Sequence, residues 1–253
     1  MKKNSVDPFV FTRKTAYMQR VADLVRNNHV RYVTGQIPMK KAVFFAQKMD
    51  LYYHCHADKV TAFRQRKLGF CSSRLLFLYT EGNDNLTWIL LVTPGEWPTP
   101  HDGKEKWLDP MQPESRVGLT GYELVRHIRK GNADPSWTWR YNSTRYDELR
   151  NAIVTAIRSR NAHELEKLIA IIWRSPSFAG VREQVKKFSQ LIKGEWTRTG
   201  VGNMPEIPSR IGYIRRVPDK GKTLTKLIKE LQNEPQKERR TADVPVQSST
   251  ETA

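Results

Sequence analysis

The first part of the chain alternates between helical and strand-like hydrophobic patterns. A helix is predicted over residues 12–28, with Thr12 as its N-cap. Its apolar positions recur every three or four residues: Tyr17, Val21, Leu24 and Val25. Residues 29–35 predict a short strand, and Pro38 then suits the first turn of a second helix. The pattern of residues 58–70 does not distinguish a helix from a loop.

Two β-hairpins are predicted in the middle of the chain. Residues 74–79 and 86–92 are almost wholly apolar and flank a loop rich in Gly, Asn and Asp, which tolerate positive φ. Strands that are apolar on both faces are expected at the centre of a sheet. A second hairpin is predicted from residues 122–130 and 136–141. On its second strand three aromatic side chains share one face: Trp137, Trp139 and Tyr141.

A proline-rich segment separates the two hairpins, and helices follow the second one. Five prolines punctuate residues 94–113, which predicts a long surface loop. Three helices with short connections are expected after residue 142, and we expect them to pack as antiparallel neighbours. Their predicted N-caps are Ser143, Asn161 with Glu164 in a capping box, and Ser177.

The C-terminal part predicts a strand over residues 211–217 and a last helix over residues 223–232. Beyond residue 232 the chain lacks aromatic residues, so we expect disorder there. The fold class is thus α+β, with antiparallel hairpins forming a sheet packed with helices, followed by a segment resembling a helical bundle. The predicted organisation is a flexible N-terminus (1–11), an α+β domain (12–142), a mainly helical segment packed on it (143–232) and a disordered tail (233–253).

The charge of the chain narrows the choice of partners. It has 43 Lys and Arg against 26 Asp and Glu, a formal net charge of +17 over 253 residues. Such a surface suits nucleic acid, an anionic membrane or an acidic protein, while the alternative is that the charge only keeps the chain soluble. Two cysteines cannot form a disulfide framework, and the longest apolar stretch is too short to span a bilayer. We therefore expect a cytoplasmic protein with no membrane partner.

Basic residues occur beside aromatic ones in several segments, which is typical of nucleic-acid binding. Arginine forks onto phosphate or guanine, and aromatic rings stack on exposed bases. The alternative is that the tryptophans belong to the core, which we favour for Trp137 and Trp139 because alternate strand positions usually face a core. The predicted nucleic-acid-binding residues are Arg64, Arg66 and Lys67 near Phe63; Arg126, Arg129, Lys130 and Arg140 near the tryptophans; Arg182, Lys186 and Lys187 on the helix from residue 179; and Arg215 and Arg216 near Tyr213.

His54 and His56 flank Cys55, and on a strand both imidazoles would point to the same side and hold a divalent metal. This spacing resembles the His-hydrophobe-His element of the replication-initiator and relaxase nucleases, although Cys55 stands where that family has a bulky apolar residue. The resemblance implies a metal that polarises a phosphate while a tyrosine attacks it. The candidate nucleophiles are then Tyr17, Tyr122 and Tyr146, and His127 is a candidate third ligand.

Two other interpretations of the histidine pair remain. His-x-His occurs often by chance, so we favour a polar, partly buried cluster without catalytic function. The other is a structural zinc site formed by Cys55, Cys71 and one or both histidines.

Residues 28–217 as a whole resemble uncharacterised proteins carried on bacterial conjugative and integrative elements. The segments that carry this resemblance are Val92-Thr93-Pro94-Gly95-Glu96, Thr120-Gly121-Tyr122-Glu123-Leu124, Pro135-Ser136-Trp137-Thr138-Trp139 and Phe178-Ala179-Gly180-Val181-Arg182. The resemblance implies a setting of DNA transfer, replication or maintenance, on a plasmid or another mobile element.

The function expected from charge and resemblance is that of a DNA-binding accessory protein without enzymatic activity. It would recognise an origin or help to assemble a transfer or replication complex, with DNA and other proteins of that complex as partners. The alternatives are a metal-dependent tyrosine nuclease and a protein that binds RNA or single strands. A cofactor, namely a divalent metal, is expected only for the nuclease.

Overall fold

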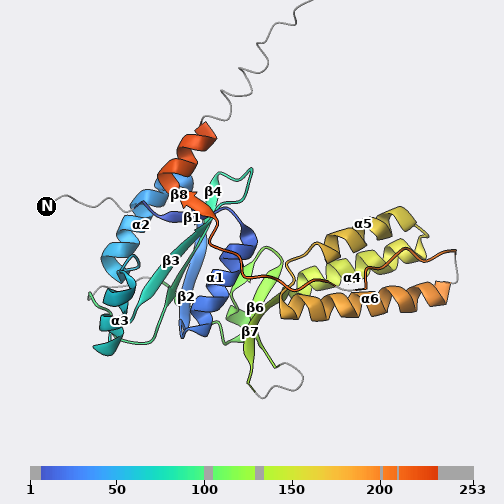
Figure 1. Ribbon diagram of the computed structural model, residues 1–253, viewed down its shortest axis with the longest axis horizontal. Coiled ribbons are helices and arrows are strands. Elements are labelled where there is room, and N and C mark those ends of the chain that lie inside the picture. Colours follow the sequence, from blue (N-terminus) through green and yellow to red (C-terminus); the bar gives the residue numbers. More distant parts are fainter. Residues whose placement is uncertain (1–6, 100–104, 129–133, 200–201, 210, 233–253) are drawn as a thin grey trace, which may run out of the picture.

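The computed structural model describes residues 7–99, 105–128, 134–199, 202–209 and 211–232, and its elements are drawn in Figure 1. The described residues contain both helices and strands, as the α+β prediction requires. In chain order the elements are β1 (Phe9–Phe11), α1 (Lys14–Arg26), β2 (Arg31–Pro38), α2 (Met39–Tyr53), α3 (Lys59–Lys67), β3 (Ser73–Leu78), β4 (Asn85–Val92), the 3-10 helix η1 (Pro113–Ser115), β5 (Gly118–Leu119), β6 (Tyr122–His127), β7 (Ser136–Tyr141), α4 (Ser143–Arg158), α5 (Ala162–Trp173), α6 (Ala179–Thr199) and β8 (Gly221–Thr223).

The first predicted hairpin forms the centre of a five-stranded sheet with the order β2-β4-β3-β1-β8. Strand β4 pairs with both β2 and β3, so the prediction of a central hairpin is confirmed. Leu86 and Leu90 contact the core on the α2 side, whereas Ile89 and Leu91 contact the core on the α1 side. Both faces of β4 are covered, and its unbroken apolar sequence follows from this position.

The edge of this sheet differs from the prediction. Residues 9–11, expected in a flexible N-terminus, form β1, which runs parallel to β3 and antiparallel to β8. A Cβ on Gly221 would lie 2.1 Å from the carbonyl oxygen of Val10, so only glycine permits this approach. Residues 224–232 are helical as predicted, and the Asp7 carboxylate accepts a hydrogen bond from the Thr225 backbone N–H at 3.0 Å.

The strand predicted over residues 211–217 is wrong. This segment has no strand partner; instead the side chain of Gln19 on α1 binds its backbone, with Nε2 donating to the Arg215 carbonyl at 2.8 Å and Oε1 accepting from Val217 N–H at 3.0 Å. A single glutamine therefore satisfies the groups that a neighbouring strand would satisfy. We call residues 207–209 and 211–220 the return segment, since they lead from the helices back to the first sheet (Figure 1).

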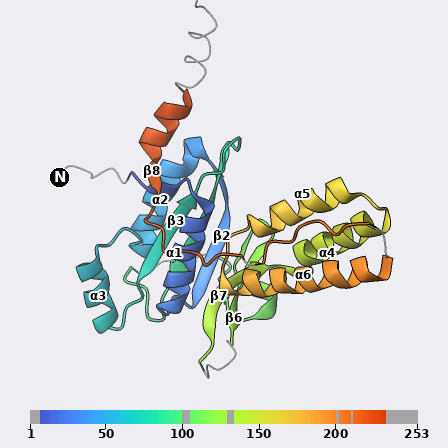
Figure 2. The same cartoon turned by 45° about the vertical axis from the view of Figure 1, so that its right-hand side comes forward.

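The second predicted hairpin lies in a separate sheet with the order β5-β6-β7, and the helices α4, α5 and α6 pack beside it (Figure 2). Trp139 is fully buried, and its indole N–H donates to the Met18 carbonyl of α1 at 2.8 Å. Thr138 on the opposite face of β7 accepts from the Gly180 N–H at 3.1 Å and so helps to cap α6. One continuous hydrophobic cluster contains residues of α1 and of α4, α5 and α6.

The helices form as predicted, but several of their N-caps differ. Helix α1 follows Arg13 rather than Thr12, Asn142 replaces Ser143 as the cap of α4, and α6 begins two residues after Ser177. The predicted cap of α5 is correct, because Asn161 accepts from the Glu164 N–H. The unassigned residues 58–70 contain α3, which is capped by Asp58. The expected tail, part of the proline-rich loop, Arg129 and Lys130 lie outside the described residues.

The helices of the described residues are all too short or too polar to cross a membrane.

Two glycines of α6 predict opposite effects of the same substitution. A Cβ on Gly180 would lie 2.7 Å from the Trp139 carbonyl oxygen, whereas a Cβ on Gly194 would meet nothing within 4 Å. We expect Gly180→Ala to lower the free energy of unfolding by about 1–3 kcal/mol through overpacking. Gly194→Ala should raise it by about 0.5–1 kcal/mol, because alanine is the better helix former. Urea denaturation followed by circular dichroism measures both, and shifts in the same direction would contradict this packing.

A buried histidine predicts a loss of stability in mild acid. His29 is 5% exposed and its Nδ1 lies 2.8 Å from the Leu24 carbonyl, which can only accept, so Nδ1 carries the proton. Burial lowers its pKa from 6.5 to about 4. Between pH 4 and pH 6.5 this histidine is protonated in the unfolded chain but neutral in the folded one. Its contribution to the free energy of unfolding is therefore complete above pH 6.5 and falls by up to about 3 kcal/mol towards pH 4. The measurement is the midpoint of urea denaturation between about pH 4 and pH 7. The wild-type midpoint should fall towards acid by this additional amount, and the His29→Asn midpoint should not. Equal pH dependence of the two midpoints would contradict the prediction.

Candidate nucleic-acid interface

Two of the predicted basic residues, Arg182 and Arg216, and two of the aromatic residues near the predicted clusters, Trp137 and Tyr213, meet in a cleft of about 360 Å³. It opens between α1, β7, the start of α6 and the return segment, which Figure 2 shows side by side. We call it the arginine–aromatic cleft, defined by Arg26, Trp137, Arg182, Tyr213 and Arg216. These side chains come from four segments of the chain. They come together only because α1 packs against β7 and the return segment packs against α1 and α6.

Arg182, which is half-buried, and Tyr213 contact each other in the cleft. The guanidinium carbon of Arg182 lies 4.3 Å from the centre of the Tyr213 ring, which is a cation–π contact. The Arg182 Nη1 also donates to the Ser177 carbonyl at 2.6 Å, which orients the guanidinium group. Tyr213 is 83% exposed. A flat ring with a positive charge beside it is a surface on which a nucleic-acid base can stack.

Asp23 organises the arginines on the α1 side of the cleft. Its Oδ1 accepts a hydrogen bond from Arg216 at 3.0 Å, and its carboxylate forms ion pairs with Arg216 at 2.6 Å, Arg26 at 3.6 Å and Arg20 at 3.8 Å. Arg20 in turn binds Asp219 through both carboxylate oxygens. These ion pairs hold the return segment against α1. Among the described residues that line the cleft, one is acidic and three are arginines, so these residues give the cleft an excess of positive charge.

A second cleft of about 410 Å³ continues from the first. It shares Arg182 and Tyr213 with the arginine–aromatic cleft and extends to Lys186, Trp173 and Pro208. The Trp173 indole N–H donates to the Pro208 carbonyl at 3.0 Å, which fixes the return segment on this side. The two clefts thus line one face of α6 on both sides of the Arg182–Tyr213 contact.

Other predicted nucleic-acid-binding residues lie elsewhere. Arg140 donates to Glu123 at 2.7 Å, and Arg116 pairs with the same carboxylate, so this arginine belongs to an ion-pair network. Lys187 lines a different pocket with Arg140, His127 and Glu183. Arg126 is exposed on β6, and Arg215 is exposed on the return segment.

The three predicted cations of α3 lie at a distance from the cleft. Arg64, Arg66 and Lys67 are all exposed, and Figures 1 and 2 both place α3 far from α6, beyond the first sheet. Lys67 lies over the Phe63 ring at 5.2 Å. This basic helix is therefore separate from the arginine–aromatic cleft.

Sequence reasoning missed the part of the cleft that α1 contributes. Gln19, Asp23 and Arg26 lie on the polar side of that helix, and no aromatic residue stands next to Arg26 in the sequence. A polar helix face usually contacts only water, so its pattern carried no signal of a site.

The strand expected around His54 and His56 is wrong. Tyr53 ends α2, and His54 is its C-cap with φ 50°, a left-handed conformation in which the chain turns. The Nε2 of His54 lies 2.9 Å from Thr99 Oγ1, whereas the Nδ1 of His56 faces Asp50 at 3.3 Å. The imidazoles therefore have separate partners and do not form the pair that the nuclease arrangement requires.

The candidate nucleophiles also lie apart from these histidines. Tyr17 is buried, which raises the pKa of its hydroxyl well above the usual range, Tyr122 stacks on Tyr141, and Tyr146 stacks on Phe188. All three pack in the cluster on the α1 side of the first sheet, while Tyr53 and Cys55 belong to the cluster on the α2 side. His127 pairs with Glu183 at 3.3 Å.

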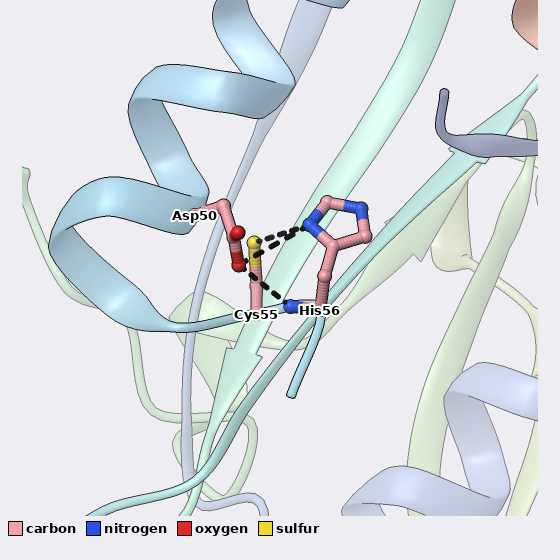
Figure 3. Close-up of side chains that lie close together, drawn as sticks. All are labelled: Asp50, Cys55 and His56. Carbon is pink, nitrogen blue, oxygen red and sulfur yellow. Dashed lines mark hydrogen bonds and ion pairs between the residues drawn. The ribbon is translucent and has the colours of Figure 1, made fainter. Parts of the chain in front are cut away.

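Among the described residues, one group of three potential metal ligands lies within 4.8 Å: Asp50, Cys55 and His56 (Figure 3). Cys71, His54 and His127, which the sequence suggested as ligands, are not in this group. Burial raises the pKa of the Cys55 thiol well above its usual range.

Comparisons with protein-family models, with curated proteins and with solved structures each found no match.

The ion pair between Asp23 and Arg216 predicts the protease sensitivity of the return segment. Asp23→Asn removes a charge-assisted hydrogen bond between a mostly buried carboxylate and an exposed arginine, and we expect the open form of the segment to become about tenfold more populated, as for a loss of about 1.4 kcal/mol. Limited trypsin digestion with mass spectrometry should then show faster cleavage after Arg215 and Arg216. Glu148→Gln is the matched control, since it removes the exposed partner of Arg145. Equal rates in the two variants would contradict the role of Asp23.

Proposed function

We propose that this protein is a DNA-binding accessory protein, and that its arginine–aromatic cleft holds phosphates together with an unstacked base. The observation that carries the proposal is the convergence of Arg26, Arg182 and Arg216 with Trp137 and Tyr213 in one cleft. Guanidinium groups bind phosphate oxygens in pairs, and aromatic rings bind the faces of bases. Both kinds of group are therefore present within reach of one nucleotide.

The dimensions of the clefts favour a single strand over an intact duplex. Volumes of about 360 and 410 Å³ fall in the range of small-ligand pockets, which accommodate a nucleotide but not a double helix. The two clefts meet at Arg182, so successive nucleotides of one strand would follow α6 towards Lys186. We therefore propose unpaired or locally opened DNA as the ligand.

The net charge of +17 supports the same function, because it attracts DNA over longer distances than the contacts in the cleft. Basic side chains release counterions from the DNA backbone, so they attract DNA whatever its sequence. In the setting that the resemblance to proteins of conjugative and integrative elements implies, such a protein would act at an origin with other proteins of a transfer or replication complex.

Two substitutions in the cleft test the proposal by fluorescence anisotropy with a labelled single-stranded DNA. We expect Tyr213→Ala to weaken binding by about 5- to 160-fold, because one stacked base contributes about 1–3 kcal/mol. Arg182→Ala should also weaken binding and reduce the slope of log K against log salt by about one, as expected for one lost phosphate contact.

The controls separate the cleft from the general charge of the protein. Arg150→Ala removes an exposed arginine of α4, and Phe44→Ala removes an exposed aromatic ring of α2, so neither should reproduce the full effect. If the cleft variants bind like these controls, the cleft is not the binding site. If the wild-type protein fails to bind DNA at low salt, DNA binding itself is refuted. Competition with duplex DNA and RNA identifies the ligand, and preference for RNA would overturn the choice of DNA.

A further inference from the structure

The end of α2 brings three potential metal ligands together. After Tyr53, the left-handed conformation of His54 reverses the chain, and Cys55 and His56 come to lie beside the last turn of the helix. The Asp50 carboxylate accepts from the His56 backbone N–H at 2.9 Å, which holds the reversal closed. Figure 3 shows the side chains of Asp50, Cys55 and His56 facing one another at this point.

The two distances from the His56 nitrogen to its neighbours match those around a tetrahedral zinc ion, and all three ligand atoms lie within 4.8 Å of one another. The Cys55 sulfur lies 3.5 Å from the His56 Nδ1, and the Asp50 Oδ1 lies 3.3 Å from the same nitrogen. Zinc bonds of about 2.3 Å to sulfur and about 2.0 Å to nitrogen and oxygen separate S from N by about 3.5 Å, and N from O by about 3.3 Å, at tetrahedral angles. Little movement is needed to admit the ion.

The same geometry excludes a cysteine-nucleophile triad. In such a triad the thiol and the carboxylate contact opposite nitrogens of the imidazole, so that one nitrogen takes the thiol proton while the carboxylate orients the ring through the other. Here both contact Nδ1. Three ligand atoms that surround one point are the arrangement of a cation site. A catalytic triad instead places the imidazole between the thiol and the carboxylate.

The ligand types and their exposure define the ion. A thiolate disfavours calcium and magnesium, whereas sulfur, imidazole nitrogen and carboxylate oxygen are all ligands of zinc. Cys55 is 3% exposed, while the side chains of Asp50 and His56 are each 30% exposed, so one side of the site is closed and the other open to water. We propose that Asp50, Cys55 and His56 bind one zinc ion at the end of α2, with water as the fourth ligand.

This ion would link the last turn of α2 to the turn that leads into α3, the basic helix with Arg64, Arg66 and Lys67. The proposal is independent of the arginine–aromatic cleft, because no residue is common to both sites.

The test measures metal on the full-length chain, purified without a polyhistidine tag and freed of metal with a chelator. After addition of zinc and removal of the excess, mass spectrometry should find about one zinc per chain, as one site with three protein ligands requires. Cobalt is the spectroscopic probe, since a thiolate ligand gives a sulfur-to-cobalt charge-transfer band and tetrahedral coordination gives intense visible bands. Cys55→Ser should abolish the charge-transfer band and lower the affinity for zinc by at least about tenfold.

Two matched variants keep the result specific. Cys71→Ser changes the second buried cysteine, and His54→Asn removes the neighbouring imidazole but keeps a residue that tolerates the left-handed conformation; neither side chain belongs to the group, so both variants should bind zinc like the wild type. His56→Gln alters a partly exposed ligand and serves if Cys55→Ser fails to fold. Failure of the wild type to retain zinc, or retention of zinc and the charge-transfer band in the ligand variants, would overturn the proposal. The readout needs no DNA, so it stands apart from the test of DNA binding.

Discussion

The architecture depends on one buried hydrogen bond between the two halves of the chain. The Trp139 indole N–H on β7 donates to the Met18 carbonyl on α1, within a hydrophobic cluster that extends from the first sheet to α6. A tryptophan buried this completely needs a partner for its N–H, so the position of β7 relative to α1 is tightly specified. The arginine–aromatic cleft lies at this junction, since α1 and β7 each form part of its lining.

The return segment completes the cleft through polar contacts instead of hydrophobic burial. Gln19 binds its backbone, while Asp23 and Asp219 take part in ion pairs that join it to α1. Such contacts contribute less than a buried core and weaken with salt. The segment that contributes Tyr213 is thus held less firmly than the rest of the cleft. Arg216 has two roles in this arrangement, since it pairs with Asp23 and also faces the space in which we propose a phosphate.

The two proposed sites differ in what holds their side chains in place. The ligand group at the end of α2 consists of residues within seven positions of one another, so a single chain reversal at His54 assembles it. The arginine–aromatic cleft joins residues separated by up to 190 positions in the sequence, from Arg26 to Arg216, and requires the complete fold. Local unfolding near α3 would accordingly affect the first site and leave the second intact.

The sequence by itself determined the helices other than α3, the two hairpins and the central position of β3 and β4, because hydrophobic periodicity reports which faces are buried. It also identified candidates for nucleic-acid contact: Arg216 because it stands near Tyr213, and Arg182 and Lys186 because they lie on the polar side of the helix from residue 179. Only the tertiary structure decided which of these meet. It paired Arg140 with Glu123, brought Arg26 to Trp137, and turned the chain at His54, where a strand was expected. The physical reason is that hydrophobic periodicity reports only which faces of an element are buried. Ion pairs depend on neighbours that are distant in the sequence, and the chain reversal depends on a single residue in a left-handed conformation.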